Sequence, residues 1–299
     1  MSVNPPLKRI AVVGGTHGNE LTGAYLIKYF EQHPELLQRS SLETLTIFGN
    51  PQAFAAGTRY VEKDLNRAFL DRDLSNPHLA TYEDKRAKEI CQVLGSKEQP
   101  KVDFIIDIHS TTSNMQFTII IGDRDPVVLS LIAYLCQLNP LVRVFNWSSI
   151  QEQSFLRSLS HRSMAIEIGA IPHGVINSWF FERTQQLVGQ ILDFLDCHNQ
   201  RTLNLKSVPT TLEIYQGKAI VDYPRTENGE LRGMVHSQLA GRDYQPLQPG
   251  APMFITFEGE EIKYMGETTV YPVFINESSY LEKGIAMVLC DRQTIPINP

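Results

Sequence analysis

Continuous apolar runs alternate with amphipathic stretches along the first two thirds of the chain. The runs are typical of strands in a sheet that is covered on both faces. We predict strands at residues 9–13, 45–48, 104–108, 117–121 and 164–168. The amphipathic stretches predict helices at residues 20–31, 84–94, 126–138 and 179–197. This alternation predicts an α/β fold with a mostly parallel sheet.

The pattern changes after about residue 205, where long helical stretches give way to short strand candidates and turns. Asn228-Gly229 lies among these turns and is typical of a tight hairpin. We therefore predict an α/β domain over residues 1–205 and a smaller β-rich domain over residues 206–299.

Composition narrows the possible partners and location. The 299 residues are 42% hydrophobic and 20% charged, as in an ordinary globular protein. The net charge of −6 leaves no basic surface for nucleic acid. The N-terminus has no apolar signal segment, and the most apolar helix is too short to span a bilayer, so we expect a cytoplasmic protein without membrane association.

The cysteines are scattered and form no C-x-x-C pair: Cys91, Cys136, Cys197 and Cys290. This spacing argues against a disulfide framework and against a thiolate zinc site. It suits a reducing compartment.

The most informative motif is the run GGTHGNE at residues 14–20, which joins the first predicted strand to the first predicted helix. His17 and Glu20 are three residues apart there, and His109 follows the third predicted strand. Ligands of open α/β sheets bind beyond the carboxyl ends of strands, so these three side chains can meet. A single histidine is usually not a ligand, but two imidazoles and one carboxylate together predict a catalytic zinc site with an open fourth position.

Glu167 lies in the middle of an apolar predicted strand. Burying a carboxylate costs free energy unless it has a partner or a task. Partial burial would raise its pKa toward the range useful for proton transfer. The alternatives of a buried ion pair or a solvent-facing position remain open.

Several other residues could bind a substrate anion. Arg59 and Arg67 lie in a loop without periodicity, and guanidinium groups match carboxylates and oxyanions bidentately. Asn66 could add a neutral donor. A solvated charged loop is the alternative for this segment, and Arg157 is equally open to both interpretations. Tyr271, judged alone, is a packed strand aromatic.

Other catalytic motifs do not fit this chain. Gly14-Gly15-x-x-Gly18 is only a loose match to a phosphate-binding loop, because it lacks the Lys-Ser/Thr ending. The sequence has no G-x-S-x-G element, so a serine hydrolase mechanism of the α/β-hydrolase type has no nucleophile.

Taken together, these motifs resemble the aspartoacylase and succinylglutamate desuccinylase family of zinc carboxypeptidase-like enzymes. The matching blocks run from residue 14 to residue 277: GGTHGNELTG, NPQAF, TRYVEKDLNRAF, DIHSTTSNM, AIEIG, VDYPRTENGE, QPLQPGAPMF and TVYPVFINE. The resemblance implies a zinc-carboxypeptidase-like, mostly parallel mixed sheet flanked by helices. It also implies that the smaller β-rich C-terminal domain contributes to the substrate pocket.

The resemblance assigns a role to each candidate residue. It implies that His17, Glu20 and His109 hold one zinc ion per chain. It implies that Glu167 is the general acid/base and that Arg59 polarises the scissile carbonyl.

The remaining candidates match substrate contacts of the family. Asn66 and Arg67 match its grip on a substrate carboxylate, and Arg157 matches the arginine for a side-chain carboxylate. Tyr271 matches a contact donated by the C-terminal domain. Gln153 departs from the family pattern, which has a tyrosine four residues before that arginine.

The function implied by the resemblance is hydrolysis of an N-acyl amino acid, with N-acetyl-L-aspartate giving acetate and L-aspartate. One alternative is a deacylase for N-acetyl neutral, aromatic or other acylated amino acids. A non-catalytic zinc-dependent binding protein is another, and nucleotide binding at residues 14–18 is a third. The resemblance also leads us to expect a homo-oligomer.

Overall fold

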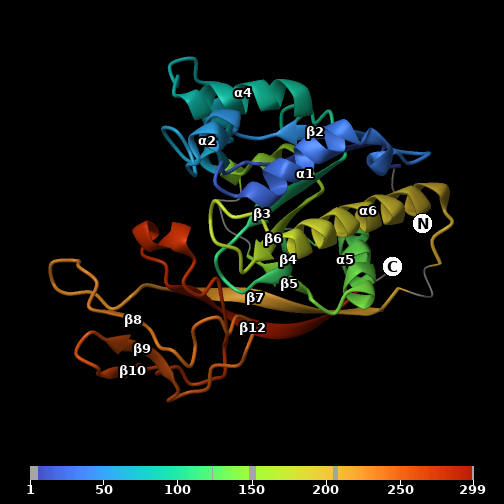
Figure 1. Ribbon diagram of the computed structural model, residues 1–299. Coiled ribbons are helices and arrows are strands. Elements are labelled where there is room, and N and C mark those ends of the chain that lie inside the picture. The colour runs from blue at the N-terminus through green and yellow to red at the C-terminus, as the bar shows by residue number, and fades with distance from the viewer. Residues whose placement is uncertain (1–5, 123, 148–152, 205–207, 298–299) are drawn as a thin grey trace.

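A nine-stranded mixed sheet forms the centre of the computed structural model, which describes residues 6–122, 124–147, 153–204 and 208–297 (Figure 1). The strand order is β11-β12-β7-β5-β4-β6-β3-β1-β2. The strands are β1 (Arg9–Gly14), β2 (Glu43–Phe48), β3 (Phe104–Ser110), β4 (Gln116–Ile121), β5 (Val142–Asn146), β6 (Ser163–Gly169), β7 (Thr211–Val221), β11 (Tyr271–Val273) and β12 (Met287–Pro296).

Most neighbouring strands at the β2 side of the sheet are parallel. β1 pairs in parallel with β2 and β3, and β3 pairs in parallel with β6. β4 runs antiparallel to β6, and β12 runs antiparallel to β7 and β11. The predicted α/β class with a mostly parallel mixed sheet is therefore confirmed. β5 was not predicted, because Arg143 interrupts its apolar run.

Helices cover both faces of the sheet. The long helices are α1 (Leu21–Gln32), α4 (Tyr82–Leu94), α5 (Pro126–Leu138) and α6 (Ser178–Gln200), and the short ones are α2 (Pro51–Ala56) and α3 (Asp71–Leu74). Alternate residues of β1 serve the two faces: Val12 packs in the cluster of α1, α5 and α6, and Val13 packs in the cluster of α4. In the described part of the chain, no helix is long and apolar enough to cross a membrane.

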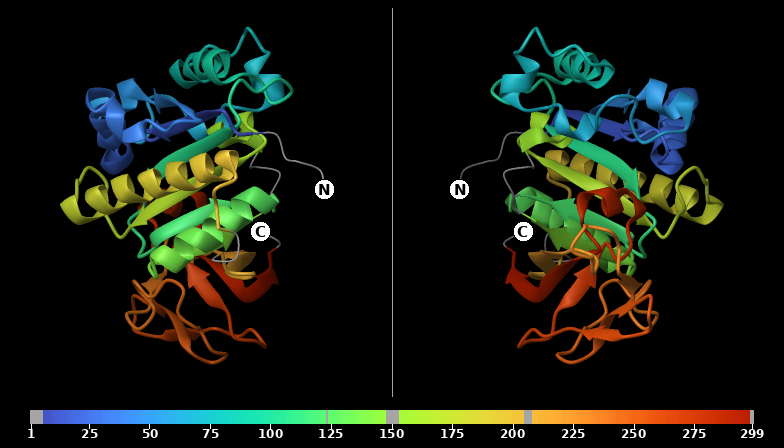
Figure 2. Two further views of the ribbon diagram at one scale, coloured as in Figure 1. Left: turned by 90° about the vertical axis from the view of Figure 1, so that its right-hand side faces the viewer. Right: turned by 90° about the vertical axis from the view of Figure 1, so that its left-hand side faces the viewer.

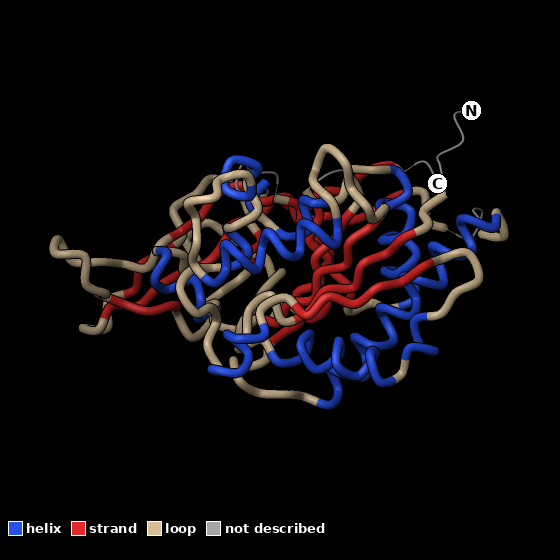
Figure 3. Tube along the Cα trace, turned by 90° about the horizontal axis from the view of Figure 1, so that it is seen from above, coloured by secondary structure: helices blue, strands red, loops and turns tan. Residues whose placement is uncertain are grey.

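The C-terminal residues build two structures. β7, β11 and β12 extend the central sheet, whereas β8 (Gly233–Val235), β9 (Pro252–Thr256) and β10 (Glu261–Lys263) form a separate antiparallel sheet. The small sheet projects from one end of the molecule (Figures 2 and 3). The predicted domain boundary at residue 205 lies outside the described residues.

The predicted hairpin at Asn228-Gly229 forms only in part. The chain reverses there, with Gly229 at φ +84°, but only an isolated bridge joins Arg225 to Leu231. The residues of this turn are exposed and include Glu227 and Glu230. Without an apolar face to bury, the reversal does not extend into a two-stranded ladder.

Candidate active site

Three adjacent parallel strands bring the predicted metal ligands to one edge of the sheet. His17 and Glu20 follow β1, and His109 lies near the end of β3. Glu167 in β6 is the register partner of His109, so their side chains leave the same face of the sheet. The strand-end rule predicted that His17, Glu20 and His109 would meet, and the structure brings these three side chains together.

Two glycines permit the tight turn that carries His17. Gly15 has φ +69°, a left-handed conformation that favours glycine. A Cβ on Gly18 would lie 2.1 Å from the Ala53 carbonyl carbon, so only glycine allows this close approach to α2. The turn therefore needs its glycines for backbone geometry.

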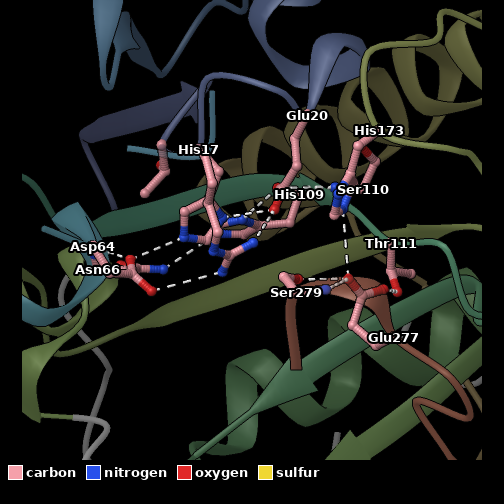
Figure 4. A network of polar contacts seen from close by, with 12 residues as sticks. His17, Glu20, Asp64, Asn66, His109, Ser110, Thr111, His173, Glu277 and Ser279 are labelled. Carbon is pink, nitrogen blue, oxygen red and sulfur yellow. Dashed lines mark hydrogen bonds and ion pairs between the residues drawn. The ribbon is translucent and has the colours of Figure 1, made fainter. Parts of the chain in front are cut away.

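The side chains of His17, Glu20 and His109 converge on one point (Figure 4). His17 Nδ1 lies 2.6 Å from Glu20 Oε1, and His109 Nδ1 lies 2.9 Å from Glu20 Oε2. One ligand atom from each residue lies within 4.8 Å of the others, and all three residues are buried. This donor set can hold a divalent metal ion, and its two nitrogens and one oxygen suit zinc.

A second layer of carboxylates orients both imidazoles through their other nitrogens. His17 Nε2 lies 3.0 Å from Asp64 Oδ1, and His109 Nε2 lies 2.9 Å from Asp107 Oδ2. Thr16 Oγ1 donates to Asp107 Oδ1 at 2.9 Å. Carboxylates in this position fix ring orientation and raise the basicity of a ligating histidine. Each imidazole is therefore held with Nδ1 toward Glu20.

Charge pairing offsets the cost of burying these groups. Burial opposes ionisation of Glu20, yet the imidazoles of His17 and His109 lower the pKa of its carboxyl well below the usual value. Burial likewise lowers the pKa of His109, but Asp107 and Glu20 reverse this effect and raise it well above the usual value. The site is thus a preorganised cluster of opposite charges.

Glu167 has the environment expected for a proton-transfer group. Burial raises the pKa of its carboxyl to about 8, with an opposing effect of His109 and a further increase from Glu20. Its buried Oε2 atom has no hydrogen-bond partner among the described residues. A carboxyl group with this pKa can take up and release a proton near neutral pH.

Arg59 and Asn66 lie directly beside the ligand cluster. Arg59 Nη1 donates to Glu20 Oε1 at 3.0 Å, and Glu20 and Asp64 raise the pKa of its guanidinium despite the opposing effect of burial. Asn66 Nδ2 lies 3.4 Å from His109 Nε2, and Asn66 Oδ1 accepts from the Leu156 amide at 2.9 Å. Arg59 therefore lies at the Glu20 side of the cluster, and Asn66 lies at the outer nitrogen of His109.

Arg67 and Arg157 both lie against the ring of Phe155. Their guanidinium carbons lie 4.7 Å and 5.6 Å from the ring centroid. Arg157 is buried in the short helix η4 (Leu156–Leu159), whereas the Gln153 residue is exposed. The structure thus brings the two arginines together and leaves Gln153 at the surface.

An apolar hollow of about 420 Å³ opens beside Arg67. Aromatic and aliphatic residues dominate its lining, which also contains two cations: Arg67, Ile120, Phe145, Trp147, Phe155, Ile220, Phe274, Tyr280, Lys283, Ile285 and Val288. The lining comes from Arg67 and Phe155, from β4 and β5 with the following residue, and from C-terminal residues between 220 and 288. Pockets of this kind, with few polar groups in apolar walls, are typical of small-molecule sites.

The position of Tyr271 does not support its predicted role. Its ring packs 5.8 Å from the Tyr215 ring, with the Arg292 guanidinium carbon 4.8 Å away. Tyr280, on the short helix η6 (Ser278–Lys283), lines the hollow instead, and burial followed by the charge of Glu167 raises its pKa. The tyrosine that the C-terminal region brings to the site is therefore Tyr280.

Glu277 joins the C-terminal region to the residues that follow His109 (Figure 4). Its buried carboxylate accepts from Thr111 Oγ1, from the Thr112 amide at 2.7 Å and from the Ser279 amide at 3.0 Å. His173 Nε2 lies 3.5 Å from Glu277 Oε1. Since Glu277 also caps η6, it fixes the helix that carries Tyr280 and Lys283.

Comparisons with known proteins agree with this arrangement. The succinylglutamate desuccinylase/aspartoacylase catalytic domain matches residues 6–195, and the AstE/AspA barrel-sandwich hybrid domain matches residues 210–292. The chain belongs to this family. A probable aspartoacylase from Nostoc sp. is 51% identical over 97% of this chain and 98% of its own.

Two further family relatives have different names. The human N-acyl-aromatic-L-amino acid amidohydrolase (carboxylate-forming) is 41% identical over 98% of this chain and 93% of its own. The crystal structure of murine aminoacylase 3 superposes with a TM-score of 0.91, at 38% identity and with 99% and 98% of the two chains covered. These relatives support an enzyme that hydrolyses the amide bond of an N-acyl amino acid.

Sequence reasoning missed the residues that support the site. Asp107 precedes His109 by two positions on one strand, so the two share a face, and this signal was available. Asp64 precedes Asn66 by two positions in the same motif. Tyr280, Lys283 and Glu277 gave no comparable local signal, because only the fold brings η6 to the sheet edge.

Proposed function

We propose that the protein is a zinc-dependent hydrolase of the amide bond of N-acyl-L-amino acids. The convergence of His17, Glu20 and His109 beside the proton-transfer candidate Glu167 carries this proposal. The donor set fits zinc, because both imidazoles present Nδ1 to the same point and have carboxylates at Nε2. Zinc, when bound there, would supply Lewis-acid polarisation and lower the pKa of a coordinated water to about 7.

The protein side chains then divide the work of hydrolysis. Glu167 takes the proton from the attacking water and returns it to the leaving amine, which its raised pKa of about 8 favours. Arg59 donates to the oxygen on which negative charge develops as the amide carbonyl is attacked. Fixed donors of this kind are worth about 10²–10³ in rate when they stabilise an oxyanion.

Arginine and asparagine side chains near the hollow bind the carboxylates of the substrate. Asn66 and Arg67 hold the α-carboxylate, and Arg157 binds a second carboxylate where the substrate has one. Together with the relative named probable aspartoacylase, this grouping supports N-acetyl-L-aspartate as the substrate, with acetate and L-aspartate as products. Tyr280 replaces Tyr271 as the proposed contact from the C-terminal region.

The apolar hollow favours a second candidate substrate. Trp147, Phe155 and Phe274 line it beside Arg67, so an aromatic side chain could lie there while Arg67 holds the α-carboxylate. The human relative named for N-acyl-aromatic amino acids supports the same candidate. Burial of one aromatic side chain contributes roughly 1.5–3 kcal/mol, enough to distinguish the two substrates.

The function is tested by measuring zinc content and kinetics with N-acetyl-L-aspartate and N-acetyl-L-phenylalanine. We expect about one zinc per chain, hydrolysis of at least one substrate, and loss of turnover after chelation. Full activity of a metal-free protein would reject the zinc site, and absence of turnover on both substrates would favour a binding protein.

The Glu167→Gln variant tests the proton-transfer role. It should lower kcat by about 10²–10⁴ while zinc remains bound, since the change keeps the size of the side chain and removes the base. The zinc content and the melting temperature provide the control for an intact fold. Near wild-type kcat in the zinc-loaded variant would exclude Glu167 as the acid/base.

A further inference from the structure

Glu83 is a fully buried carboxylate outside the ligand cluster. It lies in the first turn of α4 and binds four N–H groups. Its Oε1 accepts from Val61 N at 2.7 Å and from Asn50 Nδ2 at 3.1 Å. Its Oε2 accepts from Glu62 N at 3.1 Å and from Lys63 N at 3.2 Å. Three consecutive amides of one loop therefore share a single side chain.

The backbone of this loop has no ladder partner at residues 61–63 among the described strands. Across the described ranges, no backbone carbonyl accepts from the amides of Val61, Glu62 and Lys63. Glu83 therefore supplies the acceptors that secondary structure supplies elsewhere. Without the carboxylate, these amides would donate to water instead, and the loop would lose its geometry.

The flanking side chains strengthen the attachment. The Glu62 carboxylate accepts from the amide of Tyr82, and Lys63 Nζ pairs with Asp84. The loop backbone thus binds the side chain of Glu83, while two loop side chains bind its neighbours in α4. A capping box formed by Thr81 and Asp84 fixes the start of the helix. The loop is therefore fastened to a rigid helix terminus.

The fastened segment lies between the residues that face the substrate. Arg59 is two positions before Val61, and Asp64, Asn66 and Arg67 follow Lys63. At its first end, the Arg59 carbonyl accepts from the Gly18 amide at 3.1 Å, which links the loop to the metal-side turn. A displacement of about 1 Å at such positions can cost on the order of 10²-fold in rate.

We propose that Glu83 is a positioning residue that fixes the loop of Arg59, Asp64, Asn66 and Arg67 against the metal cluster. This inference rests on the proposed function for its kinetic consequence, but not for the attachment itself. Glu83 acts through the loop backbone. His109 and Glu167 lie outside this loop, on β3 and β6.

Amide hydrogen exchange of the wild-type protein tests the attachment directly. We expect the amides of residues 61–63 to exchange slowly, although Val61 and Glu62 are exposed residues. In the Glu83→Gln variant, one amide N–H would face the loop donors, and these three amides should exchange at least tenfold faster. Exchange of the wild-type amides at the rate of a free loop would overturn the proposal, whether or not the variant folds.

Kinetics test the consequence for the substrate. Glu83→Gln should raise KM by about tenfold for the substrate that the wild type cleaves, because Asn66 and Arg67 of the loop hold its carboxylate. It should also lower kcat, because Arg59 lies in the same loop. The matched control is Asp196→Asn on α6, away from the site. This change removes a carboxylate that accepts from the Ser41 amide at 2.7 Å. The control should lower stability and leave KM unchanged.

The kinetic outcomes separate the two proposals. A KM within twofold of wild type in folded Glu83→Gln, or an equal rise in Asp196→Asn, would overturn the positioning role. A wild-type protein that cleaves no N-acyl amino acid would instead reject the proposed function. Hydrogen exchange would then still decide whether Glu83 fixes the loop.

Discussion

The metal-side cluster and the apolar hollow are built in opposite ways. In the cluster, both nitrogens of His17 and His109 have carboxylate partners, and the residues come from three short segments, at residues 17–20, 64 and 107–109. The hollow is lined by aromatic and aliphatic side chains from segments between residues 67 and 288. The proposed chemistry thus rests on charged groups that pair with one another, whereas the proposed substrate choice rests on apolar residues assembled over long sequence distances.

This contrast separates two properties that evolve differently. Charged groups in the cluster hold one another, so a change in any of them leaves a buried charge without a partner. Apolar residues in the hollow can be exchanged at the cost of packing alone. Relatives of one family can therefore differ in substrate, as the names of the Nostoc and human proteins suggest.

The largest expected effect comes from breaking the metal-side cluster. Glu20→Gln removes the carboxylate shared by His17, His109 and Arg59. We expect loss of bound zinc and a fall in kcat/KM of at least about 10³, because three protein ligands define a catalytic zinc site. Metal analysis and the substrate assay measure both effects.

The hollow should survive this change. Binding of N-acetyl-L-phenylalanine, followed by fluorescence of Trp147 in the lining, should persist in Glu20→Gln. Glu31→Gln, at an exposed position of α1, provides the control. A variant that keeps zinc and activity within tenfold of wild type would contradict the assignment of Glu20.

The same contrast explains what the sequence could predict. His17 and Glu20 follow one strand and His109 ends another, so a general rule of parallel sheets brings them together. Neither Tyr271 nor Tyr280 could be placed by such a rule. Phe274 and Asn276, between them, both have positive φ and turn the chain, so Tyr280 reaches the hollow while Tyr271 remains on β11.

The overall fold was predictable for a related reason. Strands and helices up to residue 200 are marked by local periodicity, and every strand and helix predicted there is present. The joining of β7, β11 and β12 to the central sheet depends on pairing over long sequence distances. No local pattern distinguishes that arrangement from a wholly separate sheet.

An intermediate effect is expected at the junction between the two regions. The pKa of Glu277 is lowered from 4.5 to about 2, because its hydrogen bonds to His173, Ser279 and Thr111 outweigh burial. A lowered carboxyl pKa stabilises the fold above the unfolded value of 4.5, and this stabilisation is lost as pH falls toward 2. At about 1.4 kcal/mol per pKa unit, the contribution is on the order of 3 kcal/mol at neutral pH.

Glu277→Gln should therefore lower the free energy of unfolding by about 2 kcal/mol at pH 7, since some hydrogen bonds survive in the amide. In urea unfolding, the difference in free energy of unfolding between this variant and wild type should narrow by more than half at pH 3. Glu282→Gln, at an exposed position of the same helix η6, should have the same free energy of unfolding as wild type. A difference in free energy of unfolding that does not change with pH would mean that packing, and not the charge of Glu277, stabilises the junction.

The smallest expected effect comes from a substitution in the lining of the apolar hollow. Trp147→Ala removes an aromatic wall and leaves every metal-side contact in place, so the proposed chemistry should be unaffected. We expect kcat/KM for N-acetyl-L-phenylalanine to fall by about tenfold, equal to about 1.4 kcal/mol, while kcat/KM for N-acetyl-L-aspartate changes little. The protein has only one other tryptophan, Trp179, which is 43% exposed on α6 and so provides a matched control. Equal losses for both substrates would show that the hollow supports the catalytic groups, and the division between chemistry and substrate choice would then fail.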